Sequence, residues 1–108
     1  MNIGQIAKMA QQMQTQMAQA QDELKETTLE ATAGGGAVRI VITGAQEVRS
    51  VEIDPSAVDP DEVDMLQDLV MTAMNDAIGK SKELERERMG RIAGGMGLPG
   101  MPGLPGFG

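Results

Sequence analysis

Apolar residues recur along the first quarter of the chain at alternating spacings of three and four positions. This is the a/d pattern of a helix with a narrow apolar stripe, as in a coiled-coil seam. Glutamine and other good helix formers fill most of the positions between them. The pattern predicts a long first helix over about residues 5–26, part of which projects from the fold. The stripe consists of Ile3, Ile6, Ala10, Met13, Met17, Ala20 and Leu24.

The pattern then changes to an alternation of apolar and polar residues, which is typical of half-buried strands. Two such runs are separated by a turn at Gly44-Ala45. The glycines at 34–36 allow the positive φ angles that a hairpin turn needs. Such a small sheet cannot bury its apolar faces alone, so something else must cover it. We expect a three-stranded antiparallel meander over about residues 28–33, 37–43 and 47–53.

The next segment predicts a second long helix, from about residue 60 to about residue 90. Asp59 suits the N-cap, Pro60 suits the first helical position, and Glu62 completes an Asp-x-x-Glu capping box. Beyond Gly79 few positions are apolar, so we expect the last part to be an exposed helical arm. The apolar stripe consists of Val63, Leu66, Val70, Ala73 and Ala77, widened by Leu69, Met74 and Ile78.

These elements place the chain in the α+β class, as a single α-β-β-β-α domain over residues 1–89. The remaining residues, 90–108, hold eight glycines and three prolines. That composition cannot offset the entropy lost on ordering, so we expect a flexible Gly/Pro/Met-rich tail. A domain of this size has a modest core, and dimerisation would enlarge it.

Composition excludes several classes of function. The chain has no cysteine and no histidine, so it can form neither a disulfide, a Cys-ligated zinc site, a thiol site nor a Ser-His-Asp triad. We therefore expect no enzymatic activity, no cofactor and no metal. The chain also lacks a signal-peptide pattern and an apolar run of eighteen residues. We expect a cytoplasmic protein without a membrane contact.

A group of carboxylates near the second helix offers an alternative, because paired acids can bind Ca²⁺ or serve acid–base chemistry. The EF-hand spacing fails when it is counted from Asp59. Its sixth position is Asp64 rather than glycine, and its twelfth is Val70 rather than glutamate. The favoured interpretation is that these acids cap the helix and complement its dipole.

The net charge of −7 opposes nucleic-acid binding when it is taken as a single number. Its distribution is polarised, with seven acids and no base over residues 52–68, and five bases against three acids over residues 79–91. A mixed charged helix face is usually only solvated. Methionine at heptad spacing is likewise more often core than a binding groove.

The order of these segments resembles the YbaB/EbfC family of nucleoid-associated DNA-binding proteins over roughly residues 8–100. Three parts of the sequence carry the resemblance in the right order and spacing. They are Gly35-Gly36 through Gly44, the segment Val51-Glu52-Ile53-Asp54-Pro55, and Asp68-Leu69-Val70 followed by Ala73, Asn75, Asp76 and Ala77.

The resemblance implies a bacterial homodimer, intertwined or packed through its sheets, whose projecting helices bind duplex DNA in the nucleoid with little sequence preference. The contacts would be to phosphates, which position a protein but do not specify a sequence. The DNA-binding candidates are Lys80, Lys82, Arg86, Arg88 and Arg91 on the second helix, with Lys8 and Lys25 as weaker ones on the first.

Competing interpretations belong to a different class. Two helices that flank a β segment also describe prefoldin-like chaperone subunits, and the apolar stripe would suit a coiled-coil interaction module. A further interpretation is an acidic adaptor for a DNA-repair or replication protein. None of these requires direct DNA binding.

Overall fold

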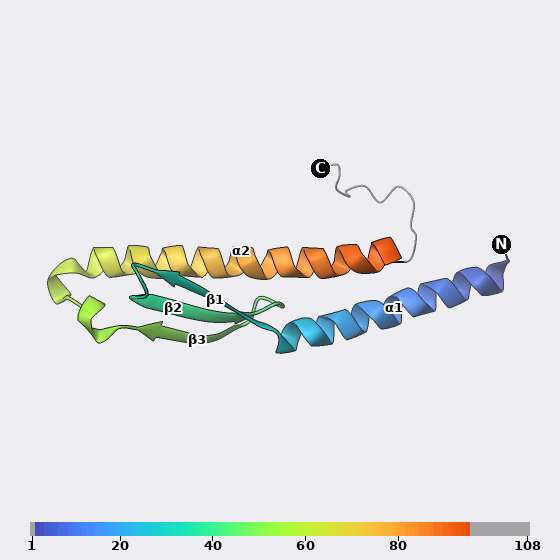
Figure 1. Ribbon diagram of the computed structural model, residues 1–108, viewed down its shortest axis with the longest axis horizontal. Helices are drawn as coiled ribbons and strands as arrows, with labels where there is room; N and C mark the ends of the chain where they lie inside the picture. The colour runs from blue at the N-terminus through green and yellow to red at the C-terminus, as the bar shows by residue number, and fades with distance from the viewer. Residues whose placement is uncertain (1, 96–108) are drawn as a thin grey trace.

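Two long helices and a three-stranded sheet make up the computed structural model, which describes residues 2–95 (Figure 1). The predicted α+β architecture and the order of its elements are confirmed. The molecule is elongated, with extents of 69, 28 and 16 Å. In chain order the elements are α1 (Ile3–Glu26), β1 (Thr28–Ala33), β2 (Val38–Thr43), β3 (Val48–Ile53), the 3-10 turns η1 (Pro55–Ala57) and η2 (Pro60–Glu62), and α2 (Val63–Gly95).

Helix α1 begins slightly before its predicted start because Asn2 caps it. The Asn2 side-chain oxygen accepts a hydrogen bond from the backbone N–H of Gln5 at 2.8 Å. Most of α1 extends beyond the sheet (Figure 1), as predicted. Only Ala20 and Leu24 of its apolar stripe are buried. Among the helices described, none is long and apolar enough to span a bilayer.

The strands pair in the order β1-β2-β3, with both pairings antiparallel, and each lies within one residue of its predicted range. The glycines at 34–36 have φ values of 65°, 68° and 98°, which confirms the glycine-dependent first turn. The second turn lies at Gly44-Ala45 as predicted, and the residue with a positive φ, 61°, is Gln46 just after it.

The pairing of β2 with β3 contains a bulge, since the register shifts between Val41 and Ile42. The shift leaves Arg49 without a direct partner in β2. It also places Val48 on the same face of the sheet as Val51, although their odd spacing predicts opposite faces. Strand β3 therefore presents three apolar side chains on one face, Val48, Val51 and Ile53.

The predicted capping box at the start of the second helix is wrong. The Asp59 carboxylate accepts a hydrogen bond from the backbone N–H of Asp61 at 2.9 Å and so caps η2. No hydrogen bond within residues 2–95 joins the Glu62 side chain back to Asp59. Pro60 at the first position suits this tight turn, and α2 begins only at Val63.

Helix α2 continues to Gly95, about five residues past its predicted end. Its last part contains the ion pairs Arg86–Glu83 and Arg91–Glu87, at spacings that stabilise a helix. No proline interrupts this section. Residues 90–95 of the predicted tail thus belong to the helix, and residues 96–108 lie outside the described residues.

The core lies between α2 and the sheet, on one face only. Helix α2 packs on β1 and β2, whose inward side chains alternate as the sequence predicts. The face beside it on β3 is left exposed. The buried cluster consists of Ala31, Ala33, Val38, Ile40, Ile42, Ala73 and Ala77.

The turn between β2 and β3 joins the sheet to both helices. The buried Ser81 hydroxyl donates to the Thr43 carbonyl oxygen at 2.6 Å and accepts the backbone N–H of Gln46 at 3.1 Å. On the other side, the backbone N–H of Gly44 donates to the Leu24 carbonyl oxygen at 2.9 Å. We call this arrangement the turn joint. Since it holds the end of α1 and the middle of α2, it sets how the helices project.

Candidate nucleic-acid interface

The five predicted cations of the second helix lie in the second half of α2. Ala73, Ala77 and Ser81 mark the buried face of this helix. Lys82 and Arg86 are four residues apart, so they share one row of the helix, and both are exposed. At 100° per residue this row lies well away from the buried face. These two side chains are therefore directed toward solvent.

Four of the five cations have an acidic partner within residues 2–95. Arg86 pairs with Glu83 at 2.8 Å, and Arg91 pairs with Glu87 at 2.5 Å, both within α2. Such exposed pairs are weak and exchange readily for another anion. Within the described residues, Lys82 alone among the five has no acidic group within 4.0 Å. Among these five cations, the row of Lys82 and Arg86 is therefore the part that is most exposed and least tied to other elements.

Lys80 and Arg88 instead connect α2 to other elements. The Lys80 ammonium lies 3.3 Å from the Asp76 carboxylate and donates to the Glu30 carbonyl oxygen of β1 at 3.2 Å. The Arg88 guanidinium lies 3.1 Å from the Glu23 carboxylate of α1, and its side chain is only 27% exposed. We infer that these two residues support the fold as well as contributing charge.

The two cations of α1 are separate from this row and from each other. Lys8 and Lys25 lie seventeen residues apart on α1, a distance of about 25 Å along its axis. Neither forms an ion pair within residues 2–95, and both are exposed. The structure thus does not gather the predicted cations into a single patch.

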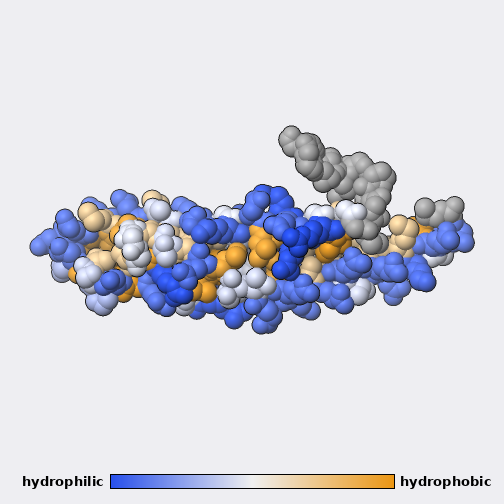
Figure 2. All heavy atoms as spheres, in the orientation of Figure 1, coloured by the Kyte–Doolittle hydropathy of each residue, from blue (hydrophilic) through white to orange (hydrophobic). Residues whose placement is uncertain are grey.

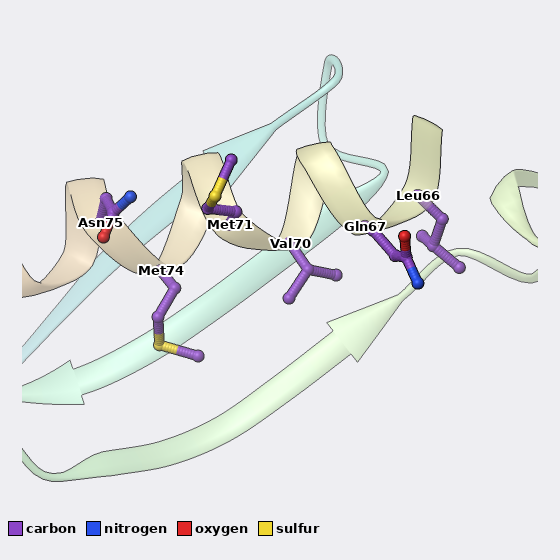
Figure 3. Close-up of a pocket in the computed structure, with 6 residues that line it drawn as sticks. All are labelled: Leu66, Gln67, Val70, Met71, Met74 and Asn75. Atoms are coloured by element: carbon purple, nitrogen blue, oxygen red, sulfur yellow. The ribbon is translucent and has the colours of Figure 1, made fainter. Parts of the chain in front are cut away.

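An apolar surface runs along the other half of α2, beside the uncovered strand β3. A groove of about 440 Å³ is lined by α2 residues, of which Leu66, Val70 and Met74 point toward the strands (Figure 3). Apolar atoms reach the exterior between the helix and the sheet (Figure 2). We call the α2 and β3 residues together the α2–β3 surface: Leu66, Val70, Met71, Met74, Val48, Val51 and Ile53.

The opposite face of the sheet is polar. Arg39 of β2 lies between Glu30 of β1 and Glu52 of β3, and its guanidinium is 2.9 Å from the Glu52 carboxylate. The hydrogen bond from Arg39 lowers the pKa of Glu30, and the same bond raises the pKa of Arg39. The charges on this outer face are therefore paired, and Val41 is its one apolar side chain on the central strand β2.

Sequence patterns did not reveal the α2–β3 surface or the turn joint. Which strand α2 leaves bare depends on where the helix crosses the sheet, and the bulge in β3 breaks the period of two. The four-residue spacing of Ala73, Ala77 and Ser81 was a usable signal for a helix face that tolerates only small side chains.

Comparisons with known proteins settle the family. The family model described as "YbaB/EbfC DNA-binding family" matches residues 1–96. The chain belongs to the YbaB/EbfC DNA-binding family. This family is one of nucleoid-associated DNA-binding proteins and is not a known enzyme family.

Curated relatives resemble the chain over nearly its whole length. A "nucleoid-associated protein" of Chloroflexus aurantiacus is 51% identical over 96 residues, which cover 89% of this chain and 96% of the relative. A "nucleoid-associated protein" of Acetivibrio thermocellus is 48% identical over 96 residues, with 89% and 85% covered. These names associate the relatives with the bacterial nucleoid.

A solved structure has a similar fold. The crystal structure of an uncharacterised protein from Helicobacter pylori matches with a TM-score of 0.78. The match covers 85% of this chain and 97% of that one, at 23% sequence identity. At this identity the similarity concerns the fold alone.

Proposed function

We propose that the chain is a nucleoid-associated protein that binds duplex DNA as a homodimer, with little sequence specificity, through phosphate contacts. The observation that carries the proposal is the exposed row of Lys82 and Arg86 on α2, in a chain of a DNA-binding family. The row offers two cations one helical turn apart, and lysine and arginine are the usual phosphate ligands.

Phosphate recognition fits the residues available to this chain better than base recognition does. The chain has a single aromatic residue, Phe107, so it lacks the platforms that stack bases or wedge a minor groove. The net charge of −7 per chain, hence −14 for a dimer, opposes the approach of DNA. Binding should therefore be modest and should weaken steeply as salt is added.

The α2–β3 surface supports the dimeric part of the proposal. Val51 is 46% exposed and Met71 is 57% exposed, so apolar side chains are left in water on a single chain. A two-fold contact places the same patch of each protomer against its partner, which would bury both. The polar row around Arg39 makes the outer face of the sheet a poorer choice.

The cellular setting follows from the same reasoning. A protein that coats duplex DNA would act in the cytoplasm, at the nucleoid. A DNA-repair or replication protein remains a proposed further partner, and it would use surfaces other than the row of Lys82 and Arg86.

Fluorescence anisotropy with labelled duplexes of unrelated sequence tests the proposal. The variant Lys82→Gln/Arg86→Gln should bind at least about tenfold more weakly at low salt, because each protomer then lacks two phosphate ligands. The matched control Gln12→Glu/Gln19→Glu changes the net charge by the same amount on α1. Equal affinity of the two variants would contradict the proposal, as would undetectable binding of the wild-type protein.

A further inference from the structure

The apolar stripe of α1 is covered at one end and bare at the other. Leu24 is fully buried at the turn joint, whereas Ile3 is 84% exposed, Ile6 is 53% exposed and Met17 is 42% exposed. A stretch of about fifteen residues without packing is marginal as an isolated helix in water. We call the bare part the α1 seam: Ile3, Ile6, Ala10, Met13 and Met17.

The spacing of the seam fits another helix. Apolar residues at alternating intervals of three and four make a stripe as narrow as a coiled-coil seam. Helix α2 contacts α1 nearer the turn joint and leaves most of this stretch exposed, with Met13 half-buried. A second α1 helix would supply the matching knobs and holes.

The charges allow that second helix to be an identical one. The positions flanking the seam, which decide pairing in coiled coils, are uncharged over this stretch. Lys8 carries the only charge between residues 2 and 21, and its heptad position lies on the side opposite the seam. Two copies therefore meet without like-charge repulsion. The flanking residues are Ala7, Met9, Gln14 and Gln16.

We propose that the α1 seam pairs with the α1 seam of a second copy, in antiparallel orientation and centred on Ala10. This register sets Ile3 of one copy against Met17 of the other, and the small Ala10 lets the helices approach at the two-fold axis. The antiparallel orientation also directs the two sheets away from each other, whereas a parallel pair would crowd them.

The seam and the α2–β3 surface lie toward opposite ends of the molecule (Figure 1). A chain with two separate self-association surfaces can join more than two copies. The formation of assemblies larger than a dimer rests on the proposed dimer through the α2–β3 surface. The pairing of two α1 seams does not depend on that dimer, and it requires no DNA.

Cross-linking tests the register directly, because the wild-type chain has no cysteine. The Ala10→Cys variant should form an intermolecular disulfide under mild oxidation. The Gln12→Cys variant places the same group on the far side of the helix and should remain largely reduced. Equal cross-linking of the two variants, or none in either, would overturn the proposal.

Sedimentation equilibrium over a range of concentrations tests the assembly. At protein concentrations where the wild-type protein is larger than a dimer, the variant Ile6→Glu/Met17→Glu should have about half the weight-average mass, because one of its two contacts is lost. Its control is again Gln12→Glu/Gln19→Glu, which should behave like the wild type. Circular dichroism checks that α1 remains helical. An unchanged mass distribution would refute the seam pairing, and it is also the result expected if residues 96–108 cover the seam instead. The DNA-binding proposal is tested separately by the anisotropy titrations and does not depend on this result.

Discussion

Single residues at the turn joint have little freedom to change, because three elements meet there. A Cβ atom at Gly44 would lie 2.7 Å from a methyl carbon of Leu24 and 3.2 Å from one of Leu84. Glycine is needed here for close approach and not for its φ angle. Ser81 is equally constrained, since its one hydroxyl serves the Thr43 carbonyl and the Gln46 backbone N–H.

The Gly44→Ala substitution should therefore lower the free energy of unfolding, by about 1–3 kcal/mol as for other overpacked sites. The matched control is Gly79→Ala, in the interior of α2, where an added Cβ meets nothing within 4 Å. That change should raise stability by roughly 0.5–1 kcal/mol. Urea denaturation measures both. A Gly44→Ala protein as stable as the wild type would show that the joint is looser than described.

Asp54 gives a residue-level prediction for pH. Hydrogen bonds from the backbone N–H and then the hydroxyl of Ser56 lower the pKa of Asp54. A group with a lowered pKa in the folded state stabilises the fold above its ordinary pKa, and that contribution is lost as the pH falls through the lowered value.

We expect the carboxyl carbon of Asp54 to titrate, in an NMR experiment, below the usual range of aspartate. The Ser56→Ala substitution removes the hydroxyl and keeps the backbone N–H. It should therefore move the titration midpoint of Asp54 part of the way back toward the usual range of aspartate. An unchanged midpoint in this variant would mean that the hydroxyl does not contribute.

At the scale of elements, local patterns predicted most of the fold, whereas contacts distant in sequence were not predictable. The alternation around Ile40 and the glycines at 34–36 determine strands and a turn within a few residues of each other. The capping box failed because Pro60 starts a 3-10 turn, in which Asp59 reaches Asp61 instead. The sequence is compatible with both the capping box and the 3-10 turn, and the path of the backbone decides which of them forms.

The candidate site divides in the same way. The cationic segment of α2 was visible in the sequence, but the partners of its side chains were not. Arg88 pairs with Glu23, sixty-five residues away, and Lys80 reaches the backbone of Glu30. These contacts depend on how the helices lie, so the sequence could not show that Lys82 and Arg86 are the more available cations.

The Ser81→Ala substitution tests the link between the elements. It removes the hydroxyl from the Thr43 carbonyl and the Gln46 N–H, which then keep only their 3.2 Å hydrogen bond to each other. We expect a cost of about 0.5–1.5 kcal/mol. Hydrogen exchange at the Gln46 amide should accelerate, because this turn is then released from α2. The control Thr15→Ala removes an exposed hydroxyl that bonds within α1, and it should leave that exchange unchanged. Equal exchange in both variants would argue against the joint.

At the scale of the whole molecule, the packing of one helix explains two proposed properties. Helix α2 covers β1 and β2 with its first half, which leaves the α2–β3 surface for a second copy. Its second half carries the exposed row of Lys82 and Arg86. A dimer would thus present two such rows, and their combined contacts would offset part of the repulsion from the net negative charge.

The dimer is tested by a charge placed at its proposed centre. Val51→Glu should shift the protein toward monomer in size-exclusion chromatography with light scattering, because the carboxylate would be buried against the partner. Thr32→Glu adds the same charge on the exposed outer face of β1 and should leave the mass unchanged. A dimer that persists in Val51→Glu, or dissociates in Thr32→Glu, would place the interface elsewhere.

The central claim is that exposed cations of α2 contact DNA phosphates, and the salt dependence of binding tests it most directly. Anisotropy titrations at several salt concentrations should give a logarithm of affinity that falls linearly with the logarithm of salt. In Lys82→Gln/Arg86→Gln the slope should be smaller in magnitude by about one for each phosphate that the variant no longer neutralises. A slope identical to that of the wild type, or wild-type binding that does not depend on salt, would contradict the account.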